Sequence, residues 1–118
     1  MSTEGVARQR VNGALMNQYH GKPICVLGYI LKADGGTSFQ VKSSDGAQIN
    51  VRLKQPISEP LSGLVEVYGI GQGKNLVLAD GYTTFAEEVS AKFDIVTYNE
   101  YVKLINTTDE DNPWKLRT

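Results

Sequence analysis

The segment Phe93–Asn106, FDIVTYNEYVKLIN, is the one stretch of the chain with the length and periodicity of a regular amphipathic helix. At about 100° per residue, four apolar side chains form one stripe, two more widen it, and three polar residues opposite are expected to face water. The stripe is Ile95, Tyr98, Val102 and Ile105, widened by Tyr101 and Leu104, with Asn99, Glu100 and Lys103 opposite. So broad an apolar arc favours packing against helices of other chains as well as closure of its own domain.

Two starts fit this helix. Asp94 can act as the N-cap, or Thr97 can cap the helix with Glu100 three residues later as a capping box. At the other end, Asn106 and the polar and acidic residues after it disfavour continuation. The helix is therefore expected to fray just beyond Asn106.

The composition of the whole chain bounds its class. With 118 residues, 41% of them hydrophobic and 21% charged, the chain suits one globular domain with one core. A net charge of −1 argues against a dedicated stand-alone nucleic-acid binder, because phosphate neutralisation supplies most non-specific affinity. The sequence has no apolar run of membrane-spanning length and no secretion signal, and its single cysteine, Cys25, favours a reducing compartment.

Before the terminal helix, the chain predicts one short helix and five strands. Asn12 is the expected N-cap of a helix over Gly13–Tyr19, which Gly21 ends. Alternating apolar residues, such as Phe39 and Val41, and glycine-containing turns define the strands. The strands are expected at Ile24–Lys32, Ser38–Lys42, Gln48–Leu53 and Leu64–Ile70, with a bulge or bend at Gly28 and a bend at Gly69. A fifth strand is expected from Asn75 or Leu76 to Ala79, with an extension to Phe85 as the alternative end.

Five short strands with few helices cannot form a flat sheet whose faces are both covered, but a closed barrel removes the strand edges and buries one face of each strand. The predicted fold is therefore all-β, a five-stranded OB-fold barrel with a short N-terminal helix and a C-terminal amphipathic helix; an SH3-like barrel is the competing architecture. The expected organisation is a mobile N-terminus at 1–9, the barrel at 10–92, the interface helix at 93–108 and a charged tail at 109–118, with 86–92 as a polar linker before the helix.

No catalytic, metal or cofactor site is recognisable in the sequence. Gly69, Gly71 and Gly73 superficially match a phosphate loop, but a strand rather than a helix follows them, so a glycine-rich hairpin is expected. His20 and Cys25 are the only residues of their types, and neither lies at metal-ligand spacing. We therefore expect a non-enzymatic protein without a cofactor, with His20 exposed and Cys25 at least half-buried.

The outer face of the second and third predicted strands is where OB-folds bind oligonucleotides. Strong single-strand binders place aromatic rings there, but this face offers only polar and charged side chains. These side chains are Ser38, Gln40, Lys42, Gln48, Asn50 and Arg52, with Lys32, Lys54 and Lys74 nearby. Weak contacts with single-stranded DNA through Lys42, Arg52, Lys32 and Lys74 are therefore the most that the face predicts.

Several segments, in this order and spacing, resemble the family of the smallest subunit of replication protein A, the eukaryotic heterotrimeric single-stranded-DNA-binding complex. The segments that carry the resemblance are RVN at 10–12, KPICVLG at 22–28, SDG at 44–46, SGLVEVYG at 62–69, and FD, YNE and VKLI at 93–94, 98–100 and 102–105. They span about residues 10 to 106. The tail with Trp114 has no counterpart in the resemblance.

This resemblance implies a nuclear, non-catalytic assembly subunit acting in DNA replication, repair and recombination. It also implies that the C-terminal helix joins one helix each from the middle and large subunits in a three-helix bundle. The implied interface residues are Ile95, Tyr98, Tyr101, Val102 and Ile105, with DNA bound mainly by the complex. Two alternatives stay open: the small subunit of a telomere-dedicated trimer, including one associated with telomerase, and a stand-alone OB-fold that binds single-stranded DNA or RNA directly.

Overall fold

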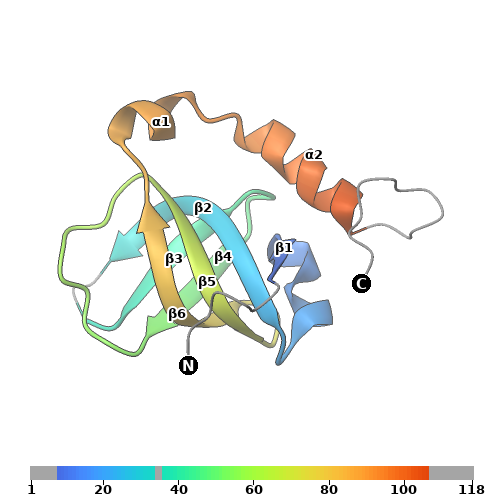
Figure 1. Ribbon diagram of the computed structural model, residues 1–118, viewed down its shortest axis with the longest axis horizontal. Helices are drawn as coiled ribbons and strands as arrows, with labels where there is room; N and C mark the ends of the chain where they lie inside the picture. Colours follow the sequence, from blue (N-terminus) through green and yellow to red (C-terminus); the bar gives the residue numbers. More distant parts are fainter. Residues whose placement is uncertain (1–7, 34–35, 107–118) are drawn as a thin grey trace.

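The structure is a computed structural model that describes residues 8–33 and 36–106 (Figure 1). Of the N-terminus expected to be mobile at 1–9, residues 1–7 lie outside the described residues, whereas Gln9 begins a strand. Residues 34–35 and the expected charged tail with Trp114 also lie outside them. The described elements are, in order, β1 (Gln9–Val11), the 3-10 helix η1 (Gly13–Tyr19), β2 (Pro23–Ala33), β3 (Ser38–Ser43), β4 (Gln48–Leu53), β5 (Leu64–Gln72), β6 (Leu76–Thr84), α1 (Glu87–Lys92) and α2 (Ile95–Ile105).

Five of the strands close into a barrel. The strand order β2-β3-β4-β6-β5 returns to β2, because β5 pairs antiparallel with β2 along seven residues from Pro23 to Tyr29. The pair of β4 and β6 is parallel, with Asn50 beside Leu76, and the other pairs within the barrel are antiparallel. This closure is that of an OB-fold, so the predicted barrel is confirmed.

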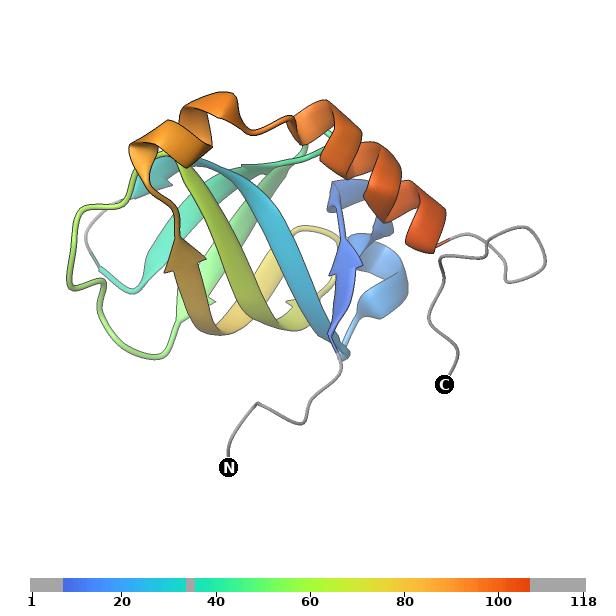
Figure 2. The same ribbon diagram turned by 45° about the horizontal axis from the view of Figure 1, so that its top comes forward.

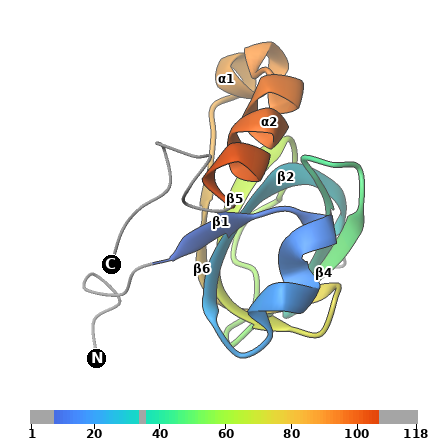
Figure 3. The same cartoon turned by 90° about the vertical axis from the view of Figure 1, so that its right-hand side faces the viewer.

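The barrel interior contains the alternating residues of the strands. Phe39 and Val41 of β3 and Ile49 and Val51 of β4 are buried, as their alternation predicts. The Phe39 ring packs edge-on against Tyr82 of β6, with 5.8 Å between the ring centroids. The helix η1 lies over one open end of the barrel with its Met16 fully buried, and Asn12 caps it by accepting a hydrogen bond from the Leu15 amide (Figure 3).

The predicted irregularity of β2 has two separate causes. Gly28 lies where the backbones of β2 and β3 approach closely, because a Cβ there would lie 2.3 Å from the Lys42 carbonyl oxygen. The bulge itself lies further along the strand, between Ile30 and Lys32, where the register with β3 shifts. At Gly69, in contrast, the predicted bend coincides with a register shift between β5 and β6.

Two elements were not expected from the sequence. The strand β1 pairs parallel with the first half of β2, beyond the point where β3 ends its pairing, and so continues that side of the sheet. The segment 86–92, expected to be a polar linker, contains the helix α1, whose first turn carries Glu87 and Glu88 and whose last turn carries Lys92. This helix is held to β5 because the hydroxyl of its Ser90 accepts a hydrogen bond of 2.7 Å from the Leu64 amide.

The helices α1 and α2 follow β6 and lie along the outer wall of the barrel beside β2 and β5, with α2 continuing over β1 and η1 (Figures 1, 2 and 3). The described residues include no helix whose length and hydropathy suit a membrane span. The arrangement places α2 on the outside of the domain, supported on one side by β1 (Figure 3).

Candidate nucleic-acid and partner interfaces

The start of α2 is decided by Asp94. Its carboxylate accepts hydrogen bonds from the Thr97 amide at 3.0 Å and from the Thr97 hydroxyl at 2.7 Å. These bonds hold the pKa of Asp94 below its ordinary value. Of the two predicted starts, the Asp94 cap is therefore the one that forms, and α2 runs from Ile95 to Ile105 with Asn106 as its C-cap.

The predicted apolar stripe of α2 faces the chain's own barrel. Val102 is fully buried and Ile105 is 8% exposed, while Ile95 and Tyr98 are half-buried beside them. Tyr101 differs from the other four predicted interface residues, because 46% of it is exposed. The barrel thus covers Val102 and Ile105 and leaves Tyr101 on the outside.

Asn99, which was expected to face water, instead anchors α2 to the domain. Its side-chain carbonyl accepts hydrogen bonds from the Asn12 amide at 2.9 Å and from the Ser44 hydroxyl at 2.8 Å. The sequence-based expectation for Asn99 was therefore wrong. The reason is tertiary: η1 and the β3–β4 turn supply polar partners next to the apolar stripe, so an amide can be accommodated there.

Asn106 forms the second anchor, at the end of α2. Its side-chain carbonyl accepts bonds from the Tyr19 hydroxyl at 2.6 Å and from the Gln9 amide at 3.1 Å. Its side-chain amide donates to the backbone carbonyl of Arg10 at 2.9 Å and to that of Val102 at 2.8 Å. These bonds tie the C-cap of the helix to both β1 and η1.

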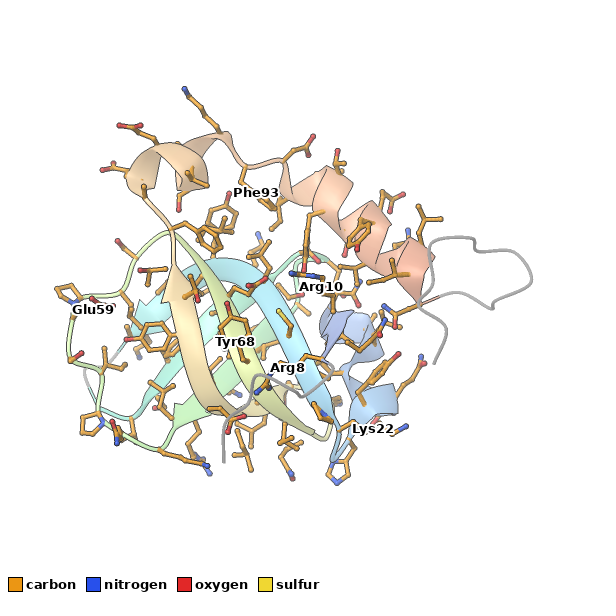
Figure 4. All side chains as sticks on the ribbon, in the orientation of Figure 1. Arg8, Arg10, Lys22, Glu59, Tyr68 and Phe93 are labelled. Carbon is orange, nitrogen blue, oxygen red and sulfur yellow. The ribbon has the colours of Figure 1, made fainter. Side chains whose placement is uncertain are left out.

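A charged cluster lies beneath the middle of α2 (Figure 4). Arg10 of β1 donates to the carboxylate of Glu66 on β5 at 2.6 Å and to the hydroxyl of Tyr98 on α2 at 3.2 Å. Burial works against the charge of Glu66, but the hydrogen bonds from Arg10 and Tyr68 outweigh it and hold the pKa of Glu66 below its ordinary value. Burial raises the pKa of Tyr98, so this hydroxyl stays protonated.

Neighbouring residues extend this cluster in two directions. Burial, together with the charge of Glu66, raises the pKa of Cys25 to about 12, so this thiol is not a reactive thiolate. Arg8 lies over the ring of Tyr68, 5.9 Å from its centroid, and pairs with Asp80 at 3.1 Å (Figure 4). The cluster therefore joins β1, β5, β6 and α2 into one polar layer on the outside of the barrel.

The side of α2 that points away from the barrel carries a second, smaller stripe, which we call the outer stripe: Thr97, Tyr101 and Leu104. These residues have the i, i+4, i+7 spacing of one helix face, and Tyr101 and Leu104 are each 46% exposed. The Tyr101 ring lies 6.3 Å from the ring of Tyr98, which in turn packs on Phe93. The outer stripe is thus an apolar surface on a well-supported helix.

The outer face of β3 and β4 has the predicted composition. Ser38, Lys42, Gln48 and Arg52 are exposed, Gln40 and Asn50 are half-buried, and none of these six side chains is aromatic. The side chains of β3, β4 and the start of β6 line an open groove of about 280 Å³. Lys42 and Arg52 lie on this face, Lys32 of β2 pairs with Gln40 of β3 next to it, and Lys74 lies in the β5–β6 turn.

The remaining sequence candidates have structural roles. His20 is exposed and accepts a hydrogen bond of 2.7 Å from the Gly73 amide, which ties the end of η1 to the β5–β6 turn. Gly73 lies in that turn with a φ of 66°, so the glycines form the expected hairpin. Within the described ranges, no three His, Cys, Asp or Glu side chains come together as metal ligands.

Sequence reasoning missed the polar anchors Arg10, Asn99 and Asn106. One signal could have revealed two of them: Asn99 and Asn106 are seven residues apart, so they lie on the same side of α2, next to its apolar stripe.

Comparison with known proteins supplies the family. The Replication factor A protein 3 family matches residues 1–111 of this chain. A 14 kDa replication protein A polypeptide from Arabidopsis thaliana is 36% identical over 97 residues, which cover 81% of this chain and 84% of that protein.

Solved structures show the same fold at low identity. A chain of U. maydis replication protein A bound to ssDNA has a TM-score of 0.72 at 20% identity, over 85% of this chain and 90% of that chain. The telomere capping protein Ten1 from Saccharomyces pombe has a TM-score of 0.64 at 8% identity, over 82% of this chain and 95% of that chain. Together with the family match over almost the full length, these findings show that the chain belongs to the Replication factor A protein 3 family, the family of small replication protein A subunits.

Proposed function

We propose that this chain is a non-catalytic assembly subunit of a nuclear, heterotrimeric single-stranded-DNA-binding complex that acts in DNA replication, repair and recombination. In this role, α2 packs with one helix each from the middle and large subunits in a three-helix bundle. The barrel holds α2 in place, and DNA is bound mainly by the assembled complex.

The outer stripe of α2 is the observation that carries this proposal. Tyr101 and Leu104 are each 46% exposed on a helix whose Val102 face packs on the barrel, and an apolar stripe of this kind suits contact with another helix. Tyrosine suits such a contact because its ring can be buried while its hydroxyl stays hydrated. Ile95 and Tyr98, which are half-buried, complete the proposed contact with the partner helices. Val102 and Ile105 face the barrel and hold α2 on it.

The proposal assigns only a minor DNA contact to this chain. Lys42 and Arg52 on β3 and β4, and Lys74 and Lys32 at the margins, can meet phosphates, but the outer face lacks the rings on which bases stack. Each missing base–aromatic contact forgoes about 1–3 kcal/mol. A stand-alone single-strand binder is therefore disfavoured against a subunit whose partners bind the DNA.

A capture experiment tests the assembly role. Tagged wild-type chain and the variant Tyr101→Asp plus Leu104→Asp are used as baits in nuclear extract, and captured proteins are identified by mass spectrometry. The wild type is expected to capture a large and a middle OB-fold subunit, and the double variant is expected to lose both, because two carboxylates cannot be buried in an apolar bundle.

Val96→Asp is the matched control. Val96 is an apolar residue of the same helix and is 71% exposed, but it lies on the side next to the exposed Lys103–Glu100 pair and outside the outer stripe. This variant should capture partners as the wild type does. Capture by the double variant equal to that by the control would refute the proposed interface.

The same experiment separates the general replication complex from a telomere-dedicated one by the identity of the captured subunits. The 36% identity to an Arabidopsis thaliana replication protein A polypeptide supports the replication complex, whereas the 8% identity to Ten1 reflects a shared fold alone. Capture of telomere-specific subunits in place of the replication subunits would overturn this assignment.

A further inference from the structure

The seated side of α2 is polar at three points along its length. Tyr98 bonds to Arg10, Asn99 to Asn12 and Ser44, and Asn106 to Gln9, Tyr19 and the Arg10 carbonyl. Resting on the assembly role proposed above, we infer that α2 stays seated on its own barrel when partner helices bind. Asn99 and Asn106 are then positioning residues, which set the rotation at which α2 presents its outer stripe.

The first reason is the free energy that would be lost if α2 left the barrel. If α2 left the barrel, its Val102 face would be buried among apolar partner helices. Asn99, three residues before Val102, and Asn106, four residues after it, would then enter that interface. Both amides would lose the partners that η1, β1 and the β3–β4 turn now provide. A buried amide without hydrogen-bond partners is strongly unfavourable, so the seated face is poorly suited to an apolar bundle.

The second reason is directional control. Apolar contacts such as those of Val102 and Ile105 tolerate small rotations, whereas hydrogen bonds depend on angle as well as distance. Asn99 and Asn106 are seven residues apart, which places the two anchors about 10 Å apart along the helix axis. Two anchors at that separation fix the rotation of α2. At about 100° per residue, Tyr101 then points about 160° away from Asn99, on the flank of α2 where 46% of it is exposed.

In one arrangement α2 stays packed on the barrel when partners bind, and in the other it leaves the barrel. The two predict opposite changes in partner affinity when barrel residues that hydrogen-bond to α2 are replaced. The test variant combines Tyr19→Phe, Ser44→Ala and Gln9→Ala, which removes one donor to Asn99 and two to Asn106 without changing α2. Asn12 is left unchanged because it also caps η1. The affinity of the purified full-length chain for the purified middle and large subunits of its own complex is then measured by titration.

If α2 binds while seated, the variant should bind about three- to tenfold more weakly, because apparent affinity scales with the fraction of chains in the binding-competent state. Tyr29→Phe is the matched control: it removes a tyrosine hydroxyl that donates to the Ser90 carbonyl of α1, leaves the α2 seat intact and should keep wild-type affinity. Circular dichroism verifies that each barrel is folded, and Tyr19→Phe alone, which keeps its ring, should show a smaller loss in the same direction.

An unchanged or tighter affinity of the seat-weakened variant would overturn the inference. Tighter binding would mean that α2 must leave the barrel, since a weaker seat makes departure easier. Failure of the wild type to bind the two subunits would instead overturn the assembly role itself, so the two failures are distinguishable.

Discussion

The guanidinium of Arg10 on β1 donates to the hydroxyl of Tyr98 on α2 across 3.2 Å, although 88 residues separate the two in the chain. The same nitrogen bonds to Glu66 of β5 at 2.6 Å, and this carboxylate has only 14% of its side chain exposed. Arg10 therefore links the terminal helix to the middle of the barrel. The barrel and α2 form one unit rather than a domain with a loose appendage.

Replacing Arg10 with Met should destabilise the chain by roughly 2 kcal/mol, because it leaves Glu66 with a mostly covered, unpaired charge. Urea unfolding followed by circular dichroism measures this loss. Lys103→Met is the control, since it removes an ion pair in which both side chains are 60% exposed and should cost less than about 0.5 kcal/mol. Equal losses in the two variants would contradict the role assigned to Arg10.

The stability of the chain should fall on acidification partly through Glu66. Its pKa is lower in the folded chain than in the unfolded one, so its contribution is fully present above the ordinary glutamate pKa of about 4.3. The contribution is lost as the pH falls from there through the lower folded pKa, because the unfolded chain then binds more protons. In thermal melts between pH 7 and pH 3, Glu66→Gln should lower the melting temperature at neutral pH and flatten its decline on acidification.

Asp45 should contribute to acid sensitivity in the same direction. Burial opposes its charge, but hydrogen bonds from the Ser43 hydroxyl and from the Ala14, Ala47 and Gly13 amides outweigh it and lower the pKa of Asp45. Asp45→Asn should therefore also flatten the acid limb of the melting curve. Glu87→Gln, at an exposed position in the first turn of α1, is the control for both variants, and a slope as flat as theirs in that control would contradict the assignment.

Gly69→Ala should destabilise the barrel by about 2 kcal/mol or more, because its new Cβ would lie 2.3 Å from the Leu78 carbonyl oxygen and the backbone would have to shift. Gly81→Ala on the facing strand is the matched control, since its Cβ would meet no atom within 4 Å. Urea unfolding of the two variants gives the comparison. A Gly69→Ala chain as stable as the control would show that the close approach at the β5–β6 bulge is not needed.

Lys42→Ala together with Arg52→Ala should change the affinity of the assembled trimer for single-stranded DNA by less than tenfold. The face carrying these residues has no aromatic side chain among its six outward positions, so it supplies at most two phosphate contacts. Fluorescence anisotropy at several salt concentrations tests this, with a loss of about 1.4 in the slope of log affinity against log salt as the upper limit for two phosphate contacts. A larger loss would show that β3 and β4 take part in binding DNA directly.

The local features of the fold could be predicted from the sequence because they depend on neighbours in the chain. Alternation placed Phe39 and Val41 inside the barrel, and Asn12 and Asp94 cap their helices through residues three positions later. The missed features depend on distant partners: β1 is three residues long and is defined by pairing with β2, and Asn99 is accommodated because Asn12 and Ser44 approach it. The periodicity of α2 identified one broad apolar stripe but not which part of it the barrel covers.

The measurement that most directly tests the role of α2 is the mass of the complex formed with purified middle and large subunits, determined by size-exclusion chromatography with light scattering. The full-length chain is compared with a chain ending at Lys92, after circular dichroism has shown that the shortened barrel is folded. The full-length chain should form a complex of one copy of each subunit, and the shortened chain should stay monomeric. A stoichiometric complex containing the shortened chain would show that the barrel, and not α2, joins this subunit to its partners.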